Sequence, residues 1–351
     1  MYIIIAIIAF GLLIAVHELG HFTAAKLLGV RVNEFAIGMG PKILKKQGKE
    51  TLYSLRLLPF GGFCAMDEDE NPKDERSFTA QRRWRRIVIL AAGGFANILA
   101  AIIIIVILVA GMKWFGGSTI TDFAEASPNA GEGKLMVGDT IVSINGERVY
   151  YMEDFQFLMQ FSDSQKVDLV IRRGGEKIKM NGFQFGQREY IIEGKPEMKY
   201  GITFNRIDAN FVESMKYSGY MTINFVRLIR FSIAQLVKGA AGVRDLAGPV
   251  AIVDAMNSIG REAPTVGVAL ANIANFIAFI GVNIAIVNLL PIPAMDGGRI
   301  LFIFLTWLIE KIMRRRVDAK YEGYIHMTAM VLLLGFMAFI LVNDVVRIVR
   351  G

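Results

Sequence analysis

The chain has 351 residues and a formal net charge of +7, with 54% hydrophobic and 20% charged residues. This composition is too apolar for an ordinary soluble protein and is typical of a membrane protein with several spans and some soluble mass. The single cysteine excludes an internal disulfide framework. Basic loops at a membrane surface explain the positive charge better than nucleic acid does, because no nucleic-acid-binding signature accompanies it.

Four apolar stretches, at residues 1–28, 87–111, 266–290 and 325–342, predict four transmembrane helices. A helix needs about 20 mostly apolar residues to cross the hydrocarbon core of a bilayer. The first stretch has neither a basic segment before it nor a small-residue cleavage pattern. We therefore expect it to remain as a helix rather than to be removed as a signal peptide.

Basic residues in two short connections predict the orientation of the chain. Arginines crowd residues 82–86, directly before the second span, and lysines and arginines crowd residues 311–320, before the fourth. Short basic loops stay on the cytoplasmic side of a membrane. Both termini and the large region between the second and third spans are therefore expected outside the cytoplasm.

The segments between the spans differ in character. Residues 29–86 contain extended runs bracketed by glycine, which predict hairpins with tight turns. Residues 114–206 combine short β-like runs with Asn-Gly and Gly-Gly turns, which predicts one small β-rich domain. Residues 211–238 gather their charges in one sector of a helix and predict an amphipathic helix on the membrane surface or over another helix.

These patterns divide the chain into four parts. We expect a first membrane core at residues 1–112 and a β-rich domain at residues 113–207. An amphipathic helix with a linker follows at residues 208–262, and a second membrane core fills residues 263–351.

The first span contains the sequence His17-Glu18-Leu19-Gly20-His21. Histidines four residues apart lie on one face of a helix, where both imidazoles can hold one metal ion, and the glutamate between them can act as a general base. Zinc is the metal that this pattern indicates. A purely structural role is disfavoured, because ionisable side chains inside a membrane are costly without a function.

A catalytic zinc ion needs one more protein ligand besides water. His326 is one candidate, but its place at the edge of the fourth span suggests an interfacial side chain. Asp296 is the better candidate, because it follows the third span in a segment that two prolines and two glycines break. A simple helix terminus with a capping aspartate is the alternative interpretation.

The first-span motif and the segment Asn288-Leu289-Leu290-Pro291-Ile292-Pro293-Ala294-Met295-Asp296-Gly297 together resemble the paired signature of the site-2 proteases, which are intramembrane zinc metalloproteases of class M50. Residues 35–41, with Gly38 and Gly40, are similar to the membrane re-entrant β-loop of that family, and residues 92–97 to its second-helix motif. Residues 248–250 are similar to a motif ahead of the third helix, and residues 133–141 to the Gly-Asp core of its PDZ domains.

The resemblance implies a polytopic α-helical membrane protein with about four transmembrane helices, a membrane re-entrant β-hairpin loop and one extracytoplasmic PDZ-like β-rich domain at residues 113–207. It implies that one zinc ion per chain is bound by His17, His21 and Asp296, and that Glu18 is the general acid and base. A further group is implied to hold the unwound substrate in extended form: Asn288, Pro291, Pro293, Gly38 and Gly40.

The resemblance also implies an activity and a location. The expected function is a zinc-dependent intramembrane endopeptidase that cleaves transmembrane segments of single-pass proteins, such as anti-sigma factors already shortened by another protease, or remnant signal peptides. The expected place is the plasma membrane of a bacterium, with the lipid bilayer as a partner, no nucleic acid, and the active site towards the cytoplasm.

Gly94 and Met295 depart from the usual proline and leucine of the family, and one PDZ-like domain replaces the tandem pair of the Gram-negative type. Two other classes of function remain as alternatives. A transporter also uses broken helices but is expected to show an internal repeat, and we see none between the two halves. A non-proteolytic protein that binds membrane helices would not need Glu18 or Asp296, and both are present.

Overall fold

Within the part of the chain that the structure describes, four helices are long and apolar enough to cross a membrane, as the sequence predicts. They are α1 (Tyr2–Leu27), α2 (Arg83–Val109), α6 (Val266–Leu289) and the part Gly323–Ile340 of α8 (Lys320–Arg350). Together with the β-sheets, these helices make the chain a polytopic membrane protein with extra β-structure.

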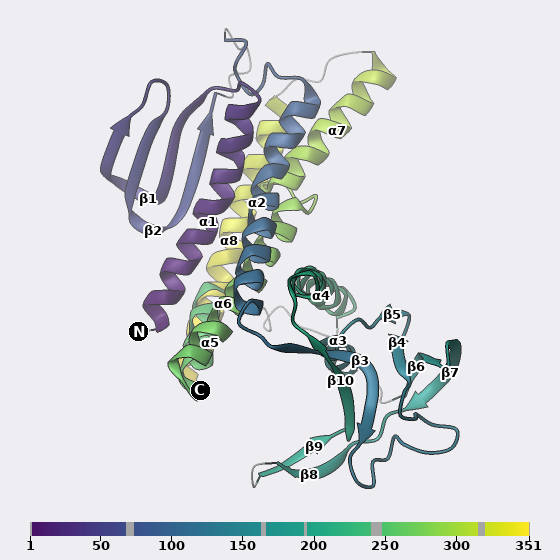
Figure 1. Cartoon of the computed structure of the whole chain (residues 1–351). Helices are drawn as coiled ribbons and strands as arrows, with labels where there is room; N and C mark the ends of the chain where they lie inside the picture. The colour runs from purple at the N-terminus through teal and green to yellow at the C-terminus, as the bar shows by residue number, and fades with distance from the viewer. Residues whose placement is uncertain are drawn as a thin grey trace. The chain divides into compact units, whose positions relative to one another are not determined.

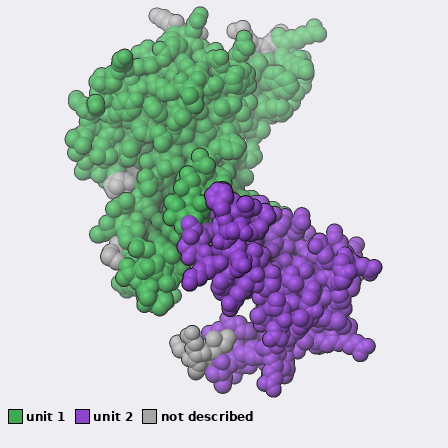
Figure 2. Space-filling view, in the orientation of Figure 1, with its two compact units in different colours: residues 1–108, 225–351 green, residues 109–224 purple. Residues whose placement is uncertain are grey.

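The computed structural model describes residues 2–67, 74–162, 166–192, 195–239, 248–314 and 320–350. The acidic run at residues 68–70 and part of the basic connection, residues 315–319, lie outside the described residues. The chain divides into two compact units, shown in green and purple in Figure 2. The first unit combines Met1–Leu108 with Phe225–Gly351, and the second unit is Val109–Asn224.

Among the described residues, four further helices lie outside the four spans, and the short helix α3 (Met152–Gln160) belongs to the second unit. The predicted amphipathic helix is present as α4 (Phe211–Val237). Two others, α5 (Pro249–Glu262) and α7 (Asp296–Met313), form where the sequence suggested only linker and connection. Helix α5 begins with proline, whose fixed φ and missing N–H suit the first turn of a helix. Its Met256 is buried with Leu13 of α1 and Ile273 of α6 in one apolar cluster.

Helices α1 and α2 approach each other closely because a glycine lies between them. A side chain on Gly20 would collide with the backbone carbonyl of Ala92 and with the methyl group of Ala96. A second apolar cluster continues this contact towards α7 and the start of the first β-strand, and contains Val32, Ile89 and Ile303. The backbones of the two helices are therefore fixed against each other in the C-terminal half of α1.

The glycine-bracketed runs of residues 29–86 join into two long strands, β1 (Val32–Gln47) and β2 (Leu52–Met66), which lie beside α1 (Figure 1). Both strands bend back on themselves, and Gly38, Gly40 and Gly61 at the bends have the positive φ values that favour glycine. As a result Ala36 pairs with Phe63 on one side and with Ser54 on the other.

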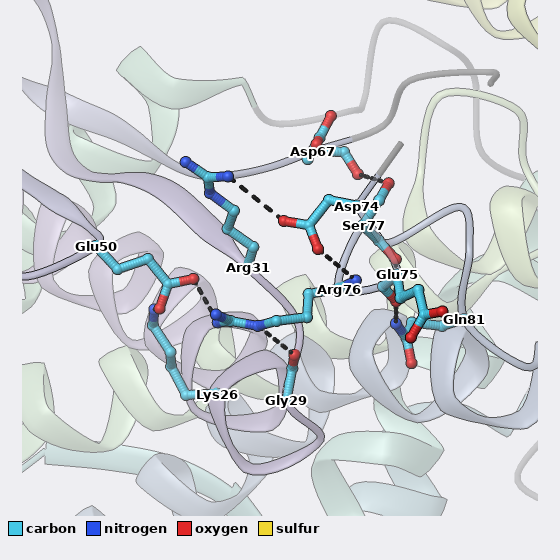
Figure 3. A network of polar contacts seen from close by, with 10 residues as sticks. All are labelled: Lys26, Gly29, Arg31, Glu50, Asp67, Asp74, Glu75, Arg76, Ser77 and Gln81. Carbon is cyan, nitrogen blue, oxygen red and sulfur yellow. Dashed lines mark hydrogen bonds and ion pairs between the residues drawn. The ribbon is translucent and has the colours of Figure 1, made fainter. Parts of the chain in front are cut away.

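A network of charged side chains holds the turn between β1 and β2 to the end of α1 (Figure 3). Glu50 in the turn accepts hydrogen bonds from Lys26 of α1 and from Arg76, which lies in the segment before α2. Arg76 also donates to the carbonyl of Gly29, and Arg31 pairs with Asp74. Three segments that are far apart in sequence meet at this charged end of the sheet.

The second unit is built on a six-stranded sheet with the order β10-β3-β4-β6-β7, in which β5 pairs with β4. The strands are β3 (Trp114–Phe123), β4 (Thr140–Ile144), β5 (Glu147–Arg148), β6 (Lys166–Arg173), β7 (Glu176–Gln184) and β10 (Ile202–Asp208). A separate hairpin pairs β8 (Arg188–Ile192) with β9 (Lys195–Lys199), and the short helix α3 (Met152–Gln160) packs against β3.

A buried aspartate explains the Gly-Asp motif of the second unit. Asp139 is completely buried, where it accepts hydrogen bonds from the guanidinium group of Arg173 and from the backbone N–H of Met136. Gly138 before it has a positive φ of 92°. The motif therefore ties the loop before β4 to β6.

Glu34 of β1 is the centre of a polar cluster within the first unit. Its carboxylate accepts hydrogen bonds from Ser54 at 2.6 Å and from Lys42 and Arg56 at 3.0 Å each. Burial alone would raise the pKa of Glu34, but these donors outweigh it and lower the pKa from 4.5 to about 2. The charged form of Glu34 therefore stabilises the sheet.

We expect Glu34→Gln to lower the stability of the detergent-solubilised protein by about 1 kcal/mol at neutral pH. Because the folded pKa lies below the unfolded one, this contribution is complete above about pH 4.5 and is lost as the pH falls towards 2. Thermal unfolding at pH 7 and pH 3 measures the difference, with the exposed Glu176→Gln as control. An equal difference between native protein and Glu34→Gln at both pH values would contradict the role of this carboxylate.

Candidate metal centre and active site

The two histidines of α1 lie on one side of the helix and are both buried. Their positions one helical turn apart bring the Nε2 atoms to 3.2 Å from each other. Glu18 follows His17 directly and faces the same cavity. The spacing therefore places both imidazoles on one side of the helix, as the sequence predicts, and a zinc ion there would need one further protein ligand.

The break after α6 brings Asp296 to this pair. The residues from Leu290 to Met295 leave the helical path, and Ala294 takes a positive φ of 77°, which is strained for a residue with a side chain. Helix α7 then starts at Asp296. Side chains on Gly297 and Gly298 would collide with the carbonyls of the preceding segment, so the two glycines allow the chain to fold back this tightly.

The three candidate ligand atoms have the spacing of a zinc site. The Oδ2 atom of Asp296 lies 3.2 Å from Nε2 of His17 and 3.3 Å from Nε2 of His21. Tetrahedral zinc with bonds of about 2.0–2.1 Å places its ligand atoms about 3.3–3.4 Å apart. His17, His21 and Asp296 are the group found among the described residues that can hold a metal ion together, and their separations fit zinc.

Helix α2 orients both imidazoles from behind. The carbonyl of Ile89 lies 2.8 Å from Nδ1 of His21, and because a carbonyl only accepts, this nitrogen carries the proton. The lone pair of Nε2 then points at the metal position, as the outer hydrogen bond of a metal-binding histidine normally ensures.

Asn97 of α2 is placed to do the same for His17. Its amide is completely buried, with Nδ2 at 3.5 Å from Nδ1 of His17, and its Oδ1 has no hydrogen-bond partner among the described residues. Rotating the carboxamide by 180° exchanges the two atoms, which look alike in most structures. In that orientation Nδ1 of His17 donates to Oδ1 of Asn97, so this oxygen gains the partner that it otherwise lacks.

The lack of a side chain at Gly93 leaves the space that the two imidazoles occupy. A Cβ atom at this position would lie 2.5 Å from Nε2 of His21 and 2.7 Å from Cε1 of His17. Real Cβ contacts are essentially never below 3.0 Å, so a side chain here would have to displace the rings or separate α1 from α2.

The candidate metal centre opens into a cavity of about 340 Å³. Its walls come from α1, β2, α2, the end of α6 and the start of α7, and its residues are Ile14, His17, Glu18, His21, Phe63, Cys64, Met66, Leu90, Ile284, Asn288, Ala294, Met295, Asp296 and Arg299. The backbone N–H of Cys64 donates to the carboxylate of Glu18. The edge of the β1–β2 sheet is therefore in direct contact with the proposed base.

The predicted substrate-binding residues are placed differently from one another. Asn288 lines the cavity, with Nδ2 at 3.3 Å from Nε2 of His17. Pro291 and Pro293 shape the break before Asp296, and Gly38 and Gly40 lie at the bend of β1. The two prolines and the two glycines are absent from the described residues that line the cavity, so Asn288 alone of the five reaches it.

Several cavity residues were not assigned by the sequence. Phe63, Cys64 and Met66 reach the cavity from β2, and only the neighbouring Gly61-Gly62 pair indicated that the backbone passes close to another element there. Arg299 follows Asp296 by one helical turn, and its guanidinium lies over the ring of Phe78. The side chain of His326 lies outside the part of the chain that the structure describes.

Comparison with known proteins identifies the family. The model of peptidase family M50 matches residues 5–336. A protein of Clostridium acetobutylicum whose name proposes a zinc metalloprotease is 36% identical, over 98% of this chain and 97% of its own. The regulator of sigma-W protease RasP of Bacillus subtilis is 26% identical, over 99% of this chain and 98% of its own.

The zinc metalloprotease RasP of Bacillus licheniformis is 25% identical, over 99% of both chains. The chain belongs to peptidase family M50 and is a bacterial membrane zinc metalloprotease of the site-2 type.

Replacement of Gly93 by alanine is expected to damage the metal centre, because the new methyl group collides with both imidazoles. We expect zinc to be lost on dialysis and cleavage to fall by about 100-fold, because a misplacement near 1 Å can have an effect of that size. Metal analysis of the purified protein measures the first effect. Gly111→Ala is the matched control, since nothing lies within 4 Å of its added Cβ. Native zinc content in Gly93→Ala would show that the rings have space that the structure does not provide.

Proposed function

We propose that this protein is an intramembrane endopeptidase that cleaves the transmembrane segments of single-pass membrane proteins, with zinc held by His17, His21 and Asp296. One observation carries the proposal. Two ligands lie within one membrane-spanning helix, and the third lies just beyond the end of another, with ligand-atom separations of 3.2–3.3 Å. A metal centre between spanning helices gives access to a substrate that is itself inside the bilayer.

Glu18 is the proposed general base and acid. Zinc at the three ligands would supply Lewis acidity, which polarises a peptide carbonyl and lowers the pKa of water. Glu18 accepts a proton from the attacking water and passes it to the nitrogen of the leaving amine. The hydrogen bond from the N–H of Cys64 fixes the carboxylate of Glu18 in the cavity. Asn288 is placed to orient the carbonyl of the substrate.

The edge of β2 is the proposed binding strand for the substrate. A helical substrate must unwind before its carbonyls can be attacked, and the unwound backbone then needs new hydrogen-bond partners. On one side of this part of β2, Phe63 pairs with Ala36 of β1. On the other side the backbone N–H of Cys64 points away from β1, towards Glu18. An extended substrate can add to this edge as a further strand. The sheet would then act as a membrane re-entrant loop.

The second unit is the proposed extracytoplasmic PDZ-type domain. It has a groove of about 430 Å³ between α3 and the edge strand β10, lined among others by Phe155, Tyr200 and Phe204. The basic connections support the orientation with both termini and this domain outside the cytoplasm and the metal centre nearer the cytoplasmic face. A domain in that position can restrict access to substrates whose outer part is already short.

The name of the Bacillus subtilis relative links that protein to the regulation of a sigma factor. On this ground we extend the substrate class to anti-sigma factors shortened by another protease, and on the resemblance to the site-2 proteases we extend it to remnant signal peptides. An unwound transmembrane segment with little mass outside the membrane is the feature that these substrates share.

Cleavage of a model single-pass substrate in detergent tests the catalytic assignment. Glu18→Gln is expected to lower the rate by about 10²–10⁴-fold and to keep zinc, because it removes the proton acceptor and none of the ligands. Asp296→Asn is expected to lose zinc as well as activity, since it removes a charged ligand. The rate is followed on a gel and the zinc by metal analysis of the same samples.

Native cleavage by Glu18→Gln would refute the proposed mechanism. Zinc-loaded native protein that binds the substrate without cutting it would favour the helix-binding alternative. Transport of a solute without cleavage would favour a transporter.

A pair of substitutions at Cys64 tests strand addition. Cys64→Ala keeps the backbone N–H that Glu18 accepts, so cleavage is expected to stay within about threefold of native. Cys64→Pro removes this N–H and blocks the edge, so cleavage is expected to fall at least about tenfold with zinc retained. Equal cleavage by the two zinc-loaded variants would count against the edge as the binding strand.

A further inference from the structure

One face of the β1–β2 sheet carries two cross-strand rows of apolar side chains. In the first row the register places Phe35 beside Tyr53 and Tyr53 beside Lys46. In the second row Ile37 lies beside Leu55 and Leu55 beside Leu44. We call this surface, made of Phe35, Ile37, Leu44, Lys46, Tyr53 and Leu55, the lysine-ended face. Each row crosses three adjacent segments of the sheet.

The lysine-ended face is exposed and hollowed. The exposed fractions are 63% for Leu44, 43% for Leu55, 41% for Tyr53 and 40% for Ile37. A groove of about 300 Å³ lies over these residues, and Lys45 and Lys46 contribute to its lining. Apolar surface of this extent needs a cover, and in a membrane protein the cover is lipid, another helix or protein.

The two lysines of the groove have no anion of their own. Lys26 pairs with Glu50 and Lys42 pairs with Glu34. Among the residues that the structure describes, no carboxylate forms an ion pair with Lys45 or Lys46. The groove therefore combines an apolar floor with two uncompensated positive charges.

The sheet is also polar at one end and apolar at the other. The turn between β1 and β2 carries the charged network of Figure 3, with Glu50 and Arg76, and Lys45 and Lys46 lie only a few residues before it. At the opposite end Met39, Leu57 and Leu58 are exposed. A bilayer has the same order, because charged headgroups lie above the hydrocarbon.

We propose that the lysine-ended face binds an anionic phospholipid of the bilayer. Its phosphate lies against Lys45 and Lys46, and an acyl chain runs along Leu44, Leu55 and Ile37. A single amphiphile meets both requirements of the groove, since it supplies the negative charge and the apolar cover. The inference rests on the proposed membrane placement of the sheet and not on the catalytic assignment.

Such a lipid would support the sheet from the side opposite its catalytic edge. The first row extends beyond Phe35 to the opposite edge of the sheet, where Phe35 pairs with Cys64. Cys64 lines the cavity, and its backbone N–H donates a hydrogen bond to Glu18. Phe22 of α1 packs on the rings of Phe35 and Tyr53. The row Cys64, Phe35, Tyr53 and Lys46 thus connects the cavity to the lipid site across the whole sheet.

Lipid retention by the full chain tests the proposal. The protein is purified in an uncharged detergent and titrated with phosphatidylglycerol or with phosphatidylcholine of the same acyl chains, and bound lipid is counted by native mass spectrometry. We expect native protein to retain one phosphatidylglycerol in preference to phosphatidylcholine. Lys45→Gln/Lys46→Gln is expected to weaken phosphatidylglycerol about tenfold or more, because each lysine near a headgroup contributes appreciably to anionic-lipid binding.

Three controls separate the contributions. Lys177→Gln/Lys179→Gln changes the net charge equally in β7 of the second unit and should retain the lipid as native protein does. Leu44→Gln should weaken both lipids, since it polarises the floor of the groove. Glycerol phosphate at the same concentrations should not compete, which distinguishes a lipid site from a site for free phosphate.

Two results would overturn the inference: equal retention of both lipids by native protein, or undiminished phosphatidylglycerol on Lys45→Gln/Lys46→Gln. The inactive Glu18→Gln variant should bind lipid as native protein does. Failure of the lipid site and failure of the protease assignment are therefore seen in different measurements.

Discussion

A carboxylate held beside two imidazoles between apolar helices is the interaction on which the first unit depends. None of the three groups belongs in such an environment alone, because each would be buried without an adequate polar partner. Three unusual features lie close together in the chain and bring Asp296 to the histidines. They are the helix break after Leu289, the strained Ala294 and the pair Gly297-Gly298. The local strain is thus the structural cost of assembling the proposed metal centre.

The same constraint explains why α2 is poor in large side chains where it faces α1. Gly93 leaves space for the rings, Ile89 offers its carbonyl to His21, and Asn97 lies behind His17. Helix α2 supplies backbone groups and one side-chain amide at the points where large side chains would push the proposed ligands apart. The network at Glu50 and Arg76 then holds the β1–β2 sheet to the end of the ligand-bearing helix, so that Cys64 remains in reach of Glu18.

Local patterns made much of this predictable from the sequence. The i, i+4 spacing places His17 and His21 on one face of a helix, and the prolines and glycines around Asp296 mark a break beside a spanning segment. Long-range pairing was not predictable, because Phe63, Cys64 and Met66 reach the cavity only through the register of two bent strands. Helix α7 was missed because residues 311–320 were interpreted as a basic loop, although the helix continues to Met313. The lysine-ended face was not predictable for the same reason, since Lys46, Tyr53 and Phe35 are neighbours only across strands.

The close contact at Gly20 has a consequence for how this protein can change over time. Because the carbonyl of Ala92 lies directly over Gly20, the distance between α1 and α2 is set by backbone against backbone. The outward side chains of these helices, such as Leu12, Phe95 and Ile107, are exposed and take no part in that contact. Substitutions among them can adapt the protein to bilayers of different thickness or fluidity while the ligands stay in register. The proposed metal centre and the membrane-facing surface can therefore evolve separately, although the same two helices carry both.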